Sequence, residues 1–437
     1  MPWPAPPGGR ARGGFRGVAP PGQHGQREGR AVPGAPPAGE PAPRDGSLPD
    51  GAAQGLAGRP FGIYVHVPFC RTRCGYCDFN TYTAAELGGG ASRESYAGQA
   101  AAEIRFAHKV LGPDVPQAAT VFLGGGTPTL LPPAQLAGIL DAIDGEFGLA
   151  PGCEVTVEAN PETVDEASLA ALRAAGVTRI SLGMQSAVPH VLAVLDRVHQ
   201  PGRPAQCARW ARAAGFEHVS LDLIYGTPGE SDADWRESLE AALAAGPDHI
   251  SAYALIVEDG TKLAARIRRG EIPPPDDDAM ADRYLAADDL LAAAGLHWYE
   301  ISNWAAGPPA QCRHNLLYWA SHNWWGVGPG AHSHVGGTRW WNVRHPSAYA
   351  ARVSAGESPA QAREILTERQ SRLERILLLT RLYSGCPLTE LGPAGAGAAR
   401  AAVADGLAEA DAYRQGRVVL TQRGRLLADA VVRDLTN

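Results

Sequence analysis

The sequence predicts an α/β protein built on a partial (βα)6 barrel of the TIM type, followed by a C-terminal α+β domain of winged-helix type. Short apolar runs alternate six times with Ala- and Leu-rich stretches of helical spacing, which is typical of a parallel sheet covered by helices. Polar or glycine-rich residues follow five successive runs, as expected where the carboxyl ends of parallel strands share one cleft. Beyond residue 367 the pattern changes to helices around one short strand.

Residues 1–58 come first and are expected to be a disordered tail, because Pro, Gly, Ala and Arg dominate and few aliphatic side chains are available to bury. The tail lacks the apolar segment of a secretory signal. The barrel is expected over residues 59–300. Its strands are predicted at residues 63–67, 120–123, 154–158, 179–182, 218–224 and 249–255. Its helices are predicted at residues 94–110, 133–147, 166–175, 232–245 and 278–294.

Residues 301–366 form an aromatic and histidine-rich extension, since seven of the ten tryptophans lie between residues 298 and 341. Such clusters are more often packed core than cofactor sites, and both interpretations stay open here. Residues 367–437 form the C-terminal domain, in which a strand at 416–421 precedes the last helix, as in winged helices. Its helix at 399–410 has too few cations for DNA phosphates, so we expect it to cover the barrel cleft instead.

The composition limits the possible partners. The 437 residues carry a net charge of −7 with a pI near 6.0, which argues against binding to nucleic acid. No run of eighteen apolar residues exists, so no integral membrane segment is expected. A cytoplasmic protein is expected, and a homodimer is possible.

Three cysteines, Cys70, Cys74 and Cys77, lie on one loop after the first apolar strand in a C-x3-C-x2-C pattern. Three thiolates at this spacing can hold one soft metal centre. Zinc would need a fourth ligand, for which only His66 is near, and a disulfide would leave one cysteine unpaired. An iron–sulfur cluster fits better, since three cysteines leave one iron open for a further ligand.

With Tyr76 directly before the last cysteine, this loop resembles the signature of the radical SAM superfamily. The resemblance implies a [4Fe–4S] cluster whose open iron binds S-adenosyl-L-methionine (SAM). From about residue 61 onward the chain is similar to the coproporphyrinogen-oxidase-like branch of that superfamily. This similarity assigns SAM binding to residues at the strand ends, namely Tyr64, Tyr76, Gly125, Gly126, Thr127, Glu158, Gln185, Arg197 and Asp222, with Ala254 added through its backbone.

Two functions compete within this branch. One is the oxygen-independent coproporphyrinogen III dehydrogenase of heme biosynthesis, and the other is the HemW-type heme chaperone, which transfers heme to acceptor hemoproteins. The dehydrogenase pattern has a further cysteine two residues after the third cluster cysteine, where this chain has Phe79. It also has an ordered N-terminal region, in place of which this chain offers the Pro- and Gly-rich tail. Both differences favour the chaperone, which is not expected to have dehydrogenase activity.

A third feature is the H-N-x-x-Y-W motif that begins at His314, which resembles the heme-associated signature of the chaperones. Histidine is a common axial ligand of heme iron, so His314 is our first candidate for the heme site. His332, His334 and Cys312 are alternative iron ligands.

Overall fold

The computed structural model describes residues 39–87, 91–200 and 202–436. Its main feature is a 13-stranded sheet in the order β1-β13-β12-β11-β10-β2-β3-β4-β5-β6-β7-β9-β8. Six parallel strands form its centre: β2 (Phe61–Val67), β3 (Ala118–Gly125), β4 (Leu149–Ala159), β5 (Arg179–Gln185), β6 (His218–Tyr225) and β7 (His249–Ala254). The predicted α/β fold with a mostly parallel sheet is confirmed.

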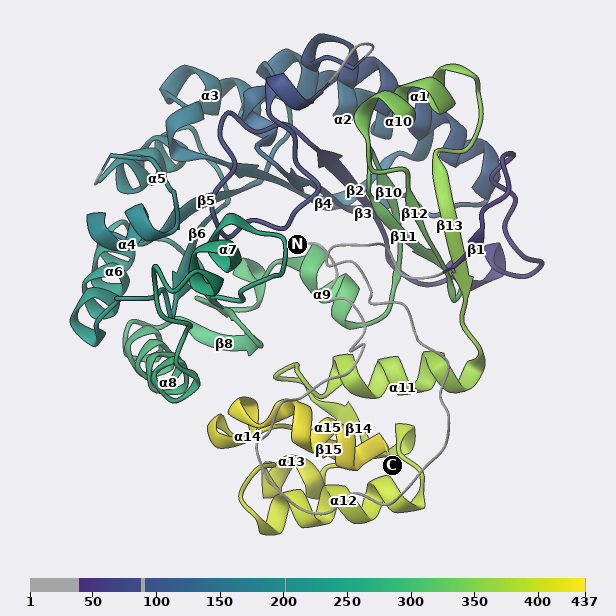
Figure 1. Ribbon diagram of the computed structural model, residues 1–437. Coiled ribbons are helices and arrows are strands. Elements are labelled where there is room, and N and C mark those ends of the chain that lie inside the picture. The colour runs from purple at the N-terminus through teal and green to yellow at the C-terminus, as the bar shows by residue number, and fades with distance from the viewer. Residues whose placement is uncertain (1–38, 88–90, 201, 437) are drawn as a thin grey trace.

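Most helices that follow these strands cover the convex outside of the curved sheet, while its concave side encloses the barrel interior (Figure 1). They are α1 (Arg93–Leu111), α2 (Pro133–Phe147), α3 (Glu166–Ala174), α4 (Pro189–Val194), α5 (Arg203–Ala213), α6 (Asp232–Ala244) and α8 (Asp277–Ala293). Helix α7 (Lys262–Arg268) lies instead at the mouth of the barrel, where Leu263 packs against Leu195. Because side chains alternate along a strand, Ile63, Val65 and Val67 pack in the core under the helices. Tyr64 and His66 therefore face the barrel interior.

Residues of the expected extension, 301–366, supply strands at both edges of the sheet. At one edge, β9 (Asn303–Ala305) pairs antiparallel with β7 and with β8 (His297–Glu300), which ends the expected barrel range. At the other, β10 (Asn323–Val327) runs parallel to β2. An antiparallel set follows it, formed by β11 (His332–Val335), β12 (Thr338–Asn342) and β13 (Ala360–Ile365). The extension thus satisfies the backbone groups that a six-stranded sheet would leave open at its edges.

Two further helices belong to this region. Helix α9 (Arg313–Trp319) lies against the concave side of the sheet, between its two edges (Figure 1), and α10 (Pro346–Ser354) packs beside α1.

The prediction of a disordered tail is wrong for its last part, residues 39–58. Strand β1 (Glu40–Pro41) pairs with β13, and Glu40 Oε1 forms an ion pair with Arg363 Nε at 2.7 Å. Leu56 is buried at 3 % exposure. Ala42 and Leu48 pack against the same core as Leu56, so a few apolar anchors and an open strand edge order this segment despite its composition. Residues 1–38 lie outside the described residues.

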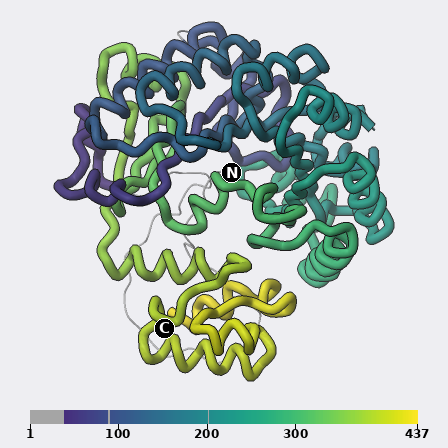
Figure 2. The backbone as a smooth tube through the Cα atoms, turned by 180° about the vertical axis from the view of Figure 1, so that it is seen from behind, coloured from purple at the N-terminus to yellow at the C-terminus, as the bar shows by residue number. Residues whose placement is uncertain are grey.

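The C-terminal residues fold into a small α+β domain with its own hydrophobic core, which Figure 2 shows as a lobe beside the barrel. Its elements are α11 (Glu368–Leu379), β14 (Cys386–Pro387), α12 (Pro393–Ala404), α13 (Ala410–Arg414), β15 (Arg417–Val418), α14 (Gln422–Leu426) and α15 (Ala428–Thr436). The predicted strand at 416–421 is shortened to β15, and the predicted last helix breaks near Leu427. No helix within the described ranges is long and apolar enough to cross a membrane.

Candidate functional site

The cysteine loop leaves the carboxyl end of β2 and is fixed by backbone hydrogen bonds. Cys70 N donates to Tyr82 O at 3.0 Å, and Tyr82 N donates to Pro68 O at 2.7 Å, which closes the base of the loop. At its far end, Gly75 N donates to Leu195 O at 3.0 Å. The loop therefore has a defined shape over the mouth of the barrel.

The three thiols lie close enough to influence one another electrostatically. Burial raises the pKa of Cys70, and it raises the pKa of Cys77 to about 12. Side-chain hydrogen bonds from Thr127 and Thr81 act in the opposite direction on Cys70. Within the described ranges no three His, Cys, Asp or Glu side chains converge on one point. A cubane cluster does not require such convergence, because each cysteine binds a different iron.

A glycine turn at the end of β3 packs directly against this loop. Gly125 has a φ of +105°, and a Cβ added there would lie 2.5 Å from the His66 ring. A Cβ on Gly126 would lie 2.5 Å from Phe69 O. Thr127 N donates to Phe69 O at 2.7 Å. Only glycine allows the backbone to approach so closely and adopt this φ.

The guanidinium of Arg197 connects the cysteine loop to the end of β5. Its Nη1 lies 3.7 Å from Cys74 Sγ, and its Nη2 donates to Gly183 O at 2.9 Å. Its Nε is buried and has no hydrogen-bond partner among the described residues. Gln185 and Asp196 have positive φ values of 64° and 51°. Non-glycine residues adopt this conformation rarely, and such strain concentrates at functional sites.

Two carboxyls face each other inside the barrel. Glu158 Oε2 accepts a 3.0 Å hydrogen bond from Gly125 N. Asp222 accepts from Ser181 Oγ, at 2.9 Å to each oxygen. Burial, and next the charge of Glu158, raise the pKa of Asp222 to about 6. The pair can accept hydrogen bonds from a cationic or hydroxyl-bearing ligand, and such a ligand would relieve their mutual repulsion.

The remaining predicted SAM residues lie around the same space. The Tyr64 hydroxyl is 3.0 Å from His66 Nδ1, and its ring packs against Phe122. Tyr76 packs in an apolar cluster with Leu195 and Leu263 at the mouth. Ala254 ends β7 and is half-buried. The structure thus places all ten predicted SAM residues along the inner side or the mouth of one barrel.

His314 lies deeper, away from the cysteine loop. It is 1 % exposed and stacks on Phe122 with ring centroids 5.2 Å apart. Its Nδ1 is 2.8 Å from Thr120 Oγ1, and its Nε2 is 2.7 Å from the Tyr318 hydroxyl. With both ring nitrogens bonded, His314 is not available to an iron in this conformation.

The other motif residues also make structural contacts. Asn315 and Trp319 donate hydrogen bonds to the buried carboxyl of Glu300, whose pKa burial raises to about 7. The H-N-x-x-Y-W motif therefore attaches α9 to the barrel interior on two sides. The alternative iron ligands are enclosed as well. Cys312 is 4 % exposed, His332 Nδ1 is 3.2 Å from Gly330 O, and His334 Nδ1 is 2.9 Å from His322 O.

Sequence reasoning missed Ser181, which orients Asp222, and Glu154, which holds the start of α9. Glu154 Oε1 accepts from His314 N at 3.0 Å, and its Oε2 forms a 3.2 Å ion pair with the buried Arg179. The alternation of side chains along β4 and β5 places these residues on the inner face, so it could have identified Ser181. The contact between Glu154 and α9 left no sequence signal, because its partners are far apart in the chain.

Comparisons with known proteins identify the superfamily and several relatives of this chain. The radical SAM superfamily matches residues 64–242. The heme chaperone HemW of Mycobacterium tuberculosis (strain H37Rv) is 55 % identical over 380 residues, covering 87 % of this chain and 96 % of the relative. The heme chaperone HemW of Synechocystis is 38 % identical over 336 residues, covering 76 % of this chain and 78 % of the relative. The solved structure of coproporphyrinogen III oxidase (HemN) from Escherichia coli shares the fold, with a TM-score of 0.75 and 20 % identity, covering 90 % of this chain and 94 % of that one.

Proposed function

Because the chain belongs to the HemW family of radical SAM proteins, we propose that it is a heme chaperone that binds heme and transfers it to acceptor hemoproteins. The observation that carries the proposal is the 55 % identity to a HemW heme chaperone over almost its whole length. Membership of the superfamily implies a [4Fe–4S] cluster and SAM, and we propose heme as the molecule that the protein transfers. An oxygen-sensitive cluster also favours a location in the cytosol.

The cysteine loop supports this function over the dehydrogenase. Phe79 occupies the position two residues after Cys77, and it is 38 % exposed. Position 79 therefore adds no fourth thiol to the three of the loop.

The residues at the mouth fit the implied cofactors. Cys70, Cys74 and Cys77 would hold the cluster, which with SAM supplies one-electron chemistry when bound. The unpartnered Nε of Arg197 offers a donor to the SAM carboxylate. Glu158 and Asp222 offer acceptors to its ammonium and hydroxyl groups. The glycine turn at Gly125 and Gly126 would leave space for SAM beside the backbone.

We keep His314 as the axial heme ligand, with a condition that its contacts impose. Heme iron can reach Nε2 only if the Tyr318 hydroxyl moves away from it. Both side chains belong to α9, so this step needs the Tyr318 side chain to rotate and the ring of His314, which is 1 % exposed, to become accessible. Heme binding is then expected to be slow.

The test is an anaerobic heme titration of the reconstituted protein, followed by absorption. Tyr318→Phe removes the hydroxyl that occupies Nε2 and should accelerate heme binding, whereas His314→Ala should abolish the histidine-ligated spectrum. The control is Tyr383→Phe, which alters an exposed tyrosine of the C-terminal domain and should change neither. Unaltered binding in His314→Ala would exclude this ligand. Turnover of coproporphyrinogen III with SAM would contradict the chaperone function.

A further inference from the structure

The cysteine loop and the aromatic extension meet at the side chain of Asn80, which lies three residues after Cys77. Its Nδ2 donates to two carbonyl oxygens of the extension, Pro329 O at 3.0 Å and Arg344 O at 2.8 Å. Its Oδ1 accepts from the Tyr82 hydroxyl at 3.1 Å and from Arg344 Nε at 3.3 Å. The two N–H groups and the two lone pairs of this one amide are therefore all in use.

The main chain of Asn80 is bound on its other side, to the barrel. Its carbonyl oxygen is 2.9 Å from His66 Nε2, and Nδ1 of the same ring is 3.0 Å from the Tyr64 hydroxyl. Asn80 thus lies between the inner face of β2 and the extension. It attaches to both of them the end of the loop that carries Cys77, residues 77–80, which we call the Cys77 arm.

The backbone turn from Gly328 to Gly330, between β10 and β11, is shaped for this contact. Gly330 has a φ of +75°, and a Cβ added there would lie 2.5 Å from Asn80 Nδ2. Gly328 has a φ of +105°, and its added Cβ would lie 2.5 Å from His66 O. Two glycines therefore let the extension reach the cysteine loop and the end of β2 more closely than other residues would.

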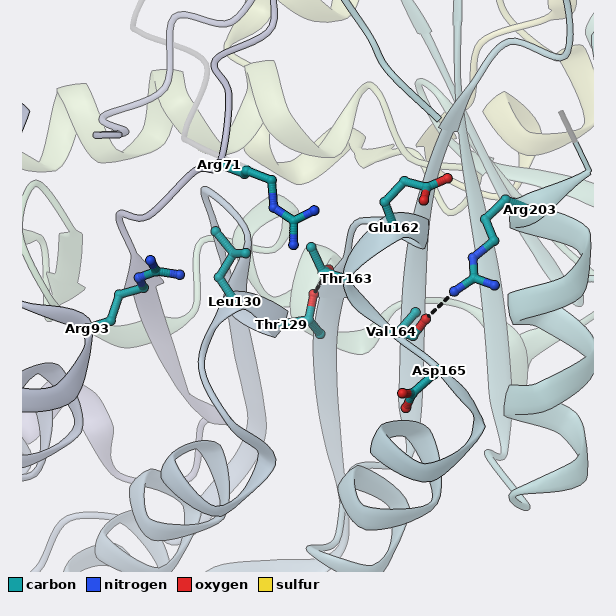
Figure 3. Close-up of a pocket in the computed structure, with 9 residues that line it drawn as sticks. All are labelled: Arg71, Arg93, Thr129, Leu130, Glu162, Thr163, Val164, Asp165 and Arg203. Atoms are coloured by element: carbon teal, nitrogen blue, oxygen red, sulfur yellow. Dashed lines mark hydrogen bonds between the residues drawn. The ribbon is translucent and has the colours of Figure 1, made fainter. Parts of the chain in front are cut away.

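The part of the loop that follows Cys70 is held differently. Arg73 bonds within the loop itself, with its Nε 3.3 Å from Thr81 Oγ1. Figure 3 shows Arg71 extending toward a polar pocket of about 350 Å³, which side chains of both charges line. The Asn80 amide therefore connects the Cys77 arm in particular to the extension.

We propose that Asn80 is a positioning residue for the [4Fe–4S] cluster, which links iron binding at Cys77 to the order of residues 328–344. Asn80 is not a cluster ligand and acts through the Cys77 arm. Without its N–H groups, the carbonyls of Pro329 and Arg344 would lose a donor in a partly buried place, which would favour separation of the arm from the turn. Because coupling between two sites is reciprocal, a cluster at Cys77 should order the extension as much as the extension stabilises the cluster.

The proposal requires the cluster that membership of the superfamily implies, and heme transfer is not part of it. The chaperone function is tested by heme titration, whereas this proposal is tested by cluster retention. Either one can therefore fail while the other holds.

The first test compares variants of the full chain after anaerobic reconstitution with iron and sulfide. Asn80→Ala should release iron to a chelator at least about fivefold faster than the wild type, because the Cys77 arm is no longer held. It should also alter the electron paramagnetic resonance signal of the reduced cluster. Asn80→Asp has nearly the same shape but no N–H donor, so it should fail in the same way.

The matched control is Asn323→Ala. Asn323 is 1 % exposed, and it also bridges two backbone groups, donating to Gly55 O at 2.8 Å and accepting from Gly336 N at 2.9 Å. It pairs with Phe61, at the end of β2 that lies opposite the cysteine loop. This variant should lose stability but release iron at the wild-type rate.

A second pair of variants disturbs the same contact from the extension and leaves the loop sequence unchanged. Gly330→Ala should accelerate iron release, because its methyl group would displace the Asn80 amide. Gly356→Ala introduces alanine at a similar φ of +70° with no described atom within 4 Å of the added Cβ, so it should retain iron like the wild type.

Hydrogen exchange tests the reciprocal effect. In the wild type, cluster assembly should slow exchange across residues 328–344, including Gly330 N, which donates to Val343 O at 3.0 Å. Asn80→Ala should lose this protection. The proposal is overturned if Asn80→Ala or Asn80→Asp retains iron and the wild-type resonance signal, if Asn323→Ala or Gly356→Ala releases iron as fast as they do, or if cluster assembly leaves exchange across residues 328–344 unchanged.

Discussion

At the residue scale, the mouth of the barrel depends on residues chosen for the ligand more than for the stability of the empty protein. Gly125 must bring its N–H to Glu158 while its α-carbon faces the ring of His66. Asp222 is an acid kept partly buried beside another acid. Both arrangements cost stability in the absence of a ligand, as is common where groups are held ready for binding.

Gly125→Ala should destabilise the protein by about 2 kcal/mol or more and abolish SAM binding, because the added methyl meets His66 and the φ of +105° is strained for alanine. Gly138→Ala is the matched control. Gly138 lies inside α2, and apart from its own helix backbone no described atom lies within 4 Å of an added Cβ, so this change should stabilise the protein by about 0.5–1 kcal/mol. Chemical denaturation and SAM titration would measure both effects, and a Gly125→Ala variant that binds SAM normally would contradict the geometry.

Asp222→Asn should stabilise the ligand-free protein at pH 7 and weaken SAM binding. The folded pKa of about 6 exceeds the ordinary value of 3.8, so the folded state holds a proton that the unfolded state releases between these pH values. Stability contributed by Asp222 is therefore present at low pH and lost as pH rises through about 6, and asparagine removes this loss. Thermal unfolding from about pH 4 to 8, with and without SAM, would measure the difference. An unchanged pH profile in the variant would show that Asp222 is not the titrating group.

At the element scale, the central strands and most of their helices could be predicted from the sequence, because alternating apolar runs and helical spacing are local signals. The strands from β8 to β13 could not, since they are short and their tryptophans suggested a separate aromatic region. The role of α9 was the hardest to foresee. Its motif suggested a ligand, yet its side chains bond to Thr120 and Glu300, and those partners depend on tertiary packing.

Removing the carboxyl that holds α9 tests this role. Glu154→Ala should cost about 3–5 kcal/mol, because it leaves Arg179 buried without its ion-pair partner and leaves the first N–H groups of α9 unsatisfied. Glu217→Ala removes the exposed partner of Arg173 and should cost less than about 1 kcal/mol. Denaturant titration would compare the two variants. A small loss in Glu154→Ala would mean that α9 is held by its aromatic packing instead.

At the scale of the whole molecule, one arginine links the C-terminal domain to the barrel. Arg425 of α14 pairs with Asp288 of α8 through two contacts, Nη1 to Oδ1 at 2.9 Å and Nη2 to Oδ2 at 2.6 Å. Its guanidinium also lies over the Trp298 ring, 4.5 Å from the centroid. The planar fork and the stacking act together, so the domain is fixed in orientation as well as in position.

Arg425→Ala should therefore loosen the domain without unfolding either part, because each has its own core. Limited proteolysis should cut the connection between β13 and α11 at least about tenfold faster, since cleavage follows the population of the open form and a paired, stacked arginine contributes about 1.5–3 kcal/mol. Arg425→Lys should be cleaved almost as fast as Arg425→Ala, because lysine lacks both the forked hydrogen-bond geometry and the planar face of arginine. Arg433→Ala is the control, as that side chain is exposed and, among the described residues, forms an ion pair with its neighbour Asp434 alone, at 3.7 Å. Equal cleavage of Arg425→Ala and Arg433→Ala would place the anchoring contacts elsewhere in the interface.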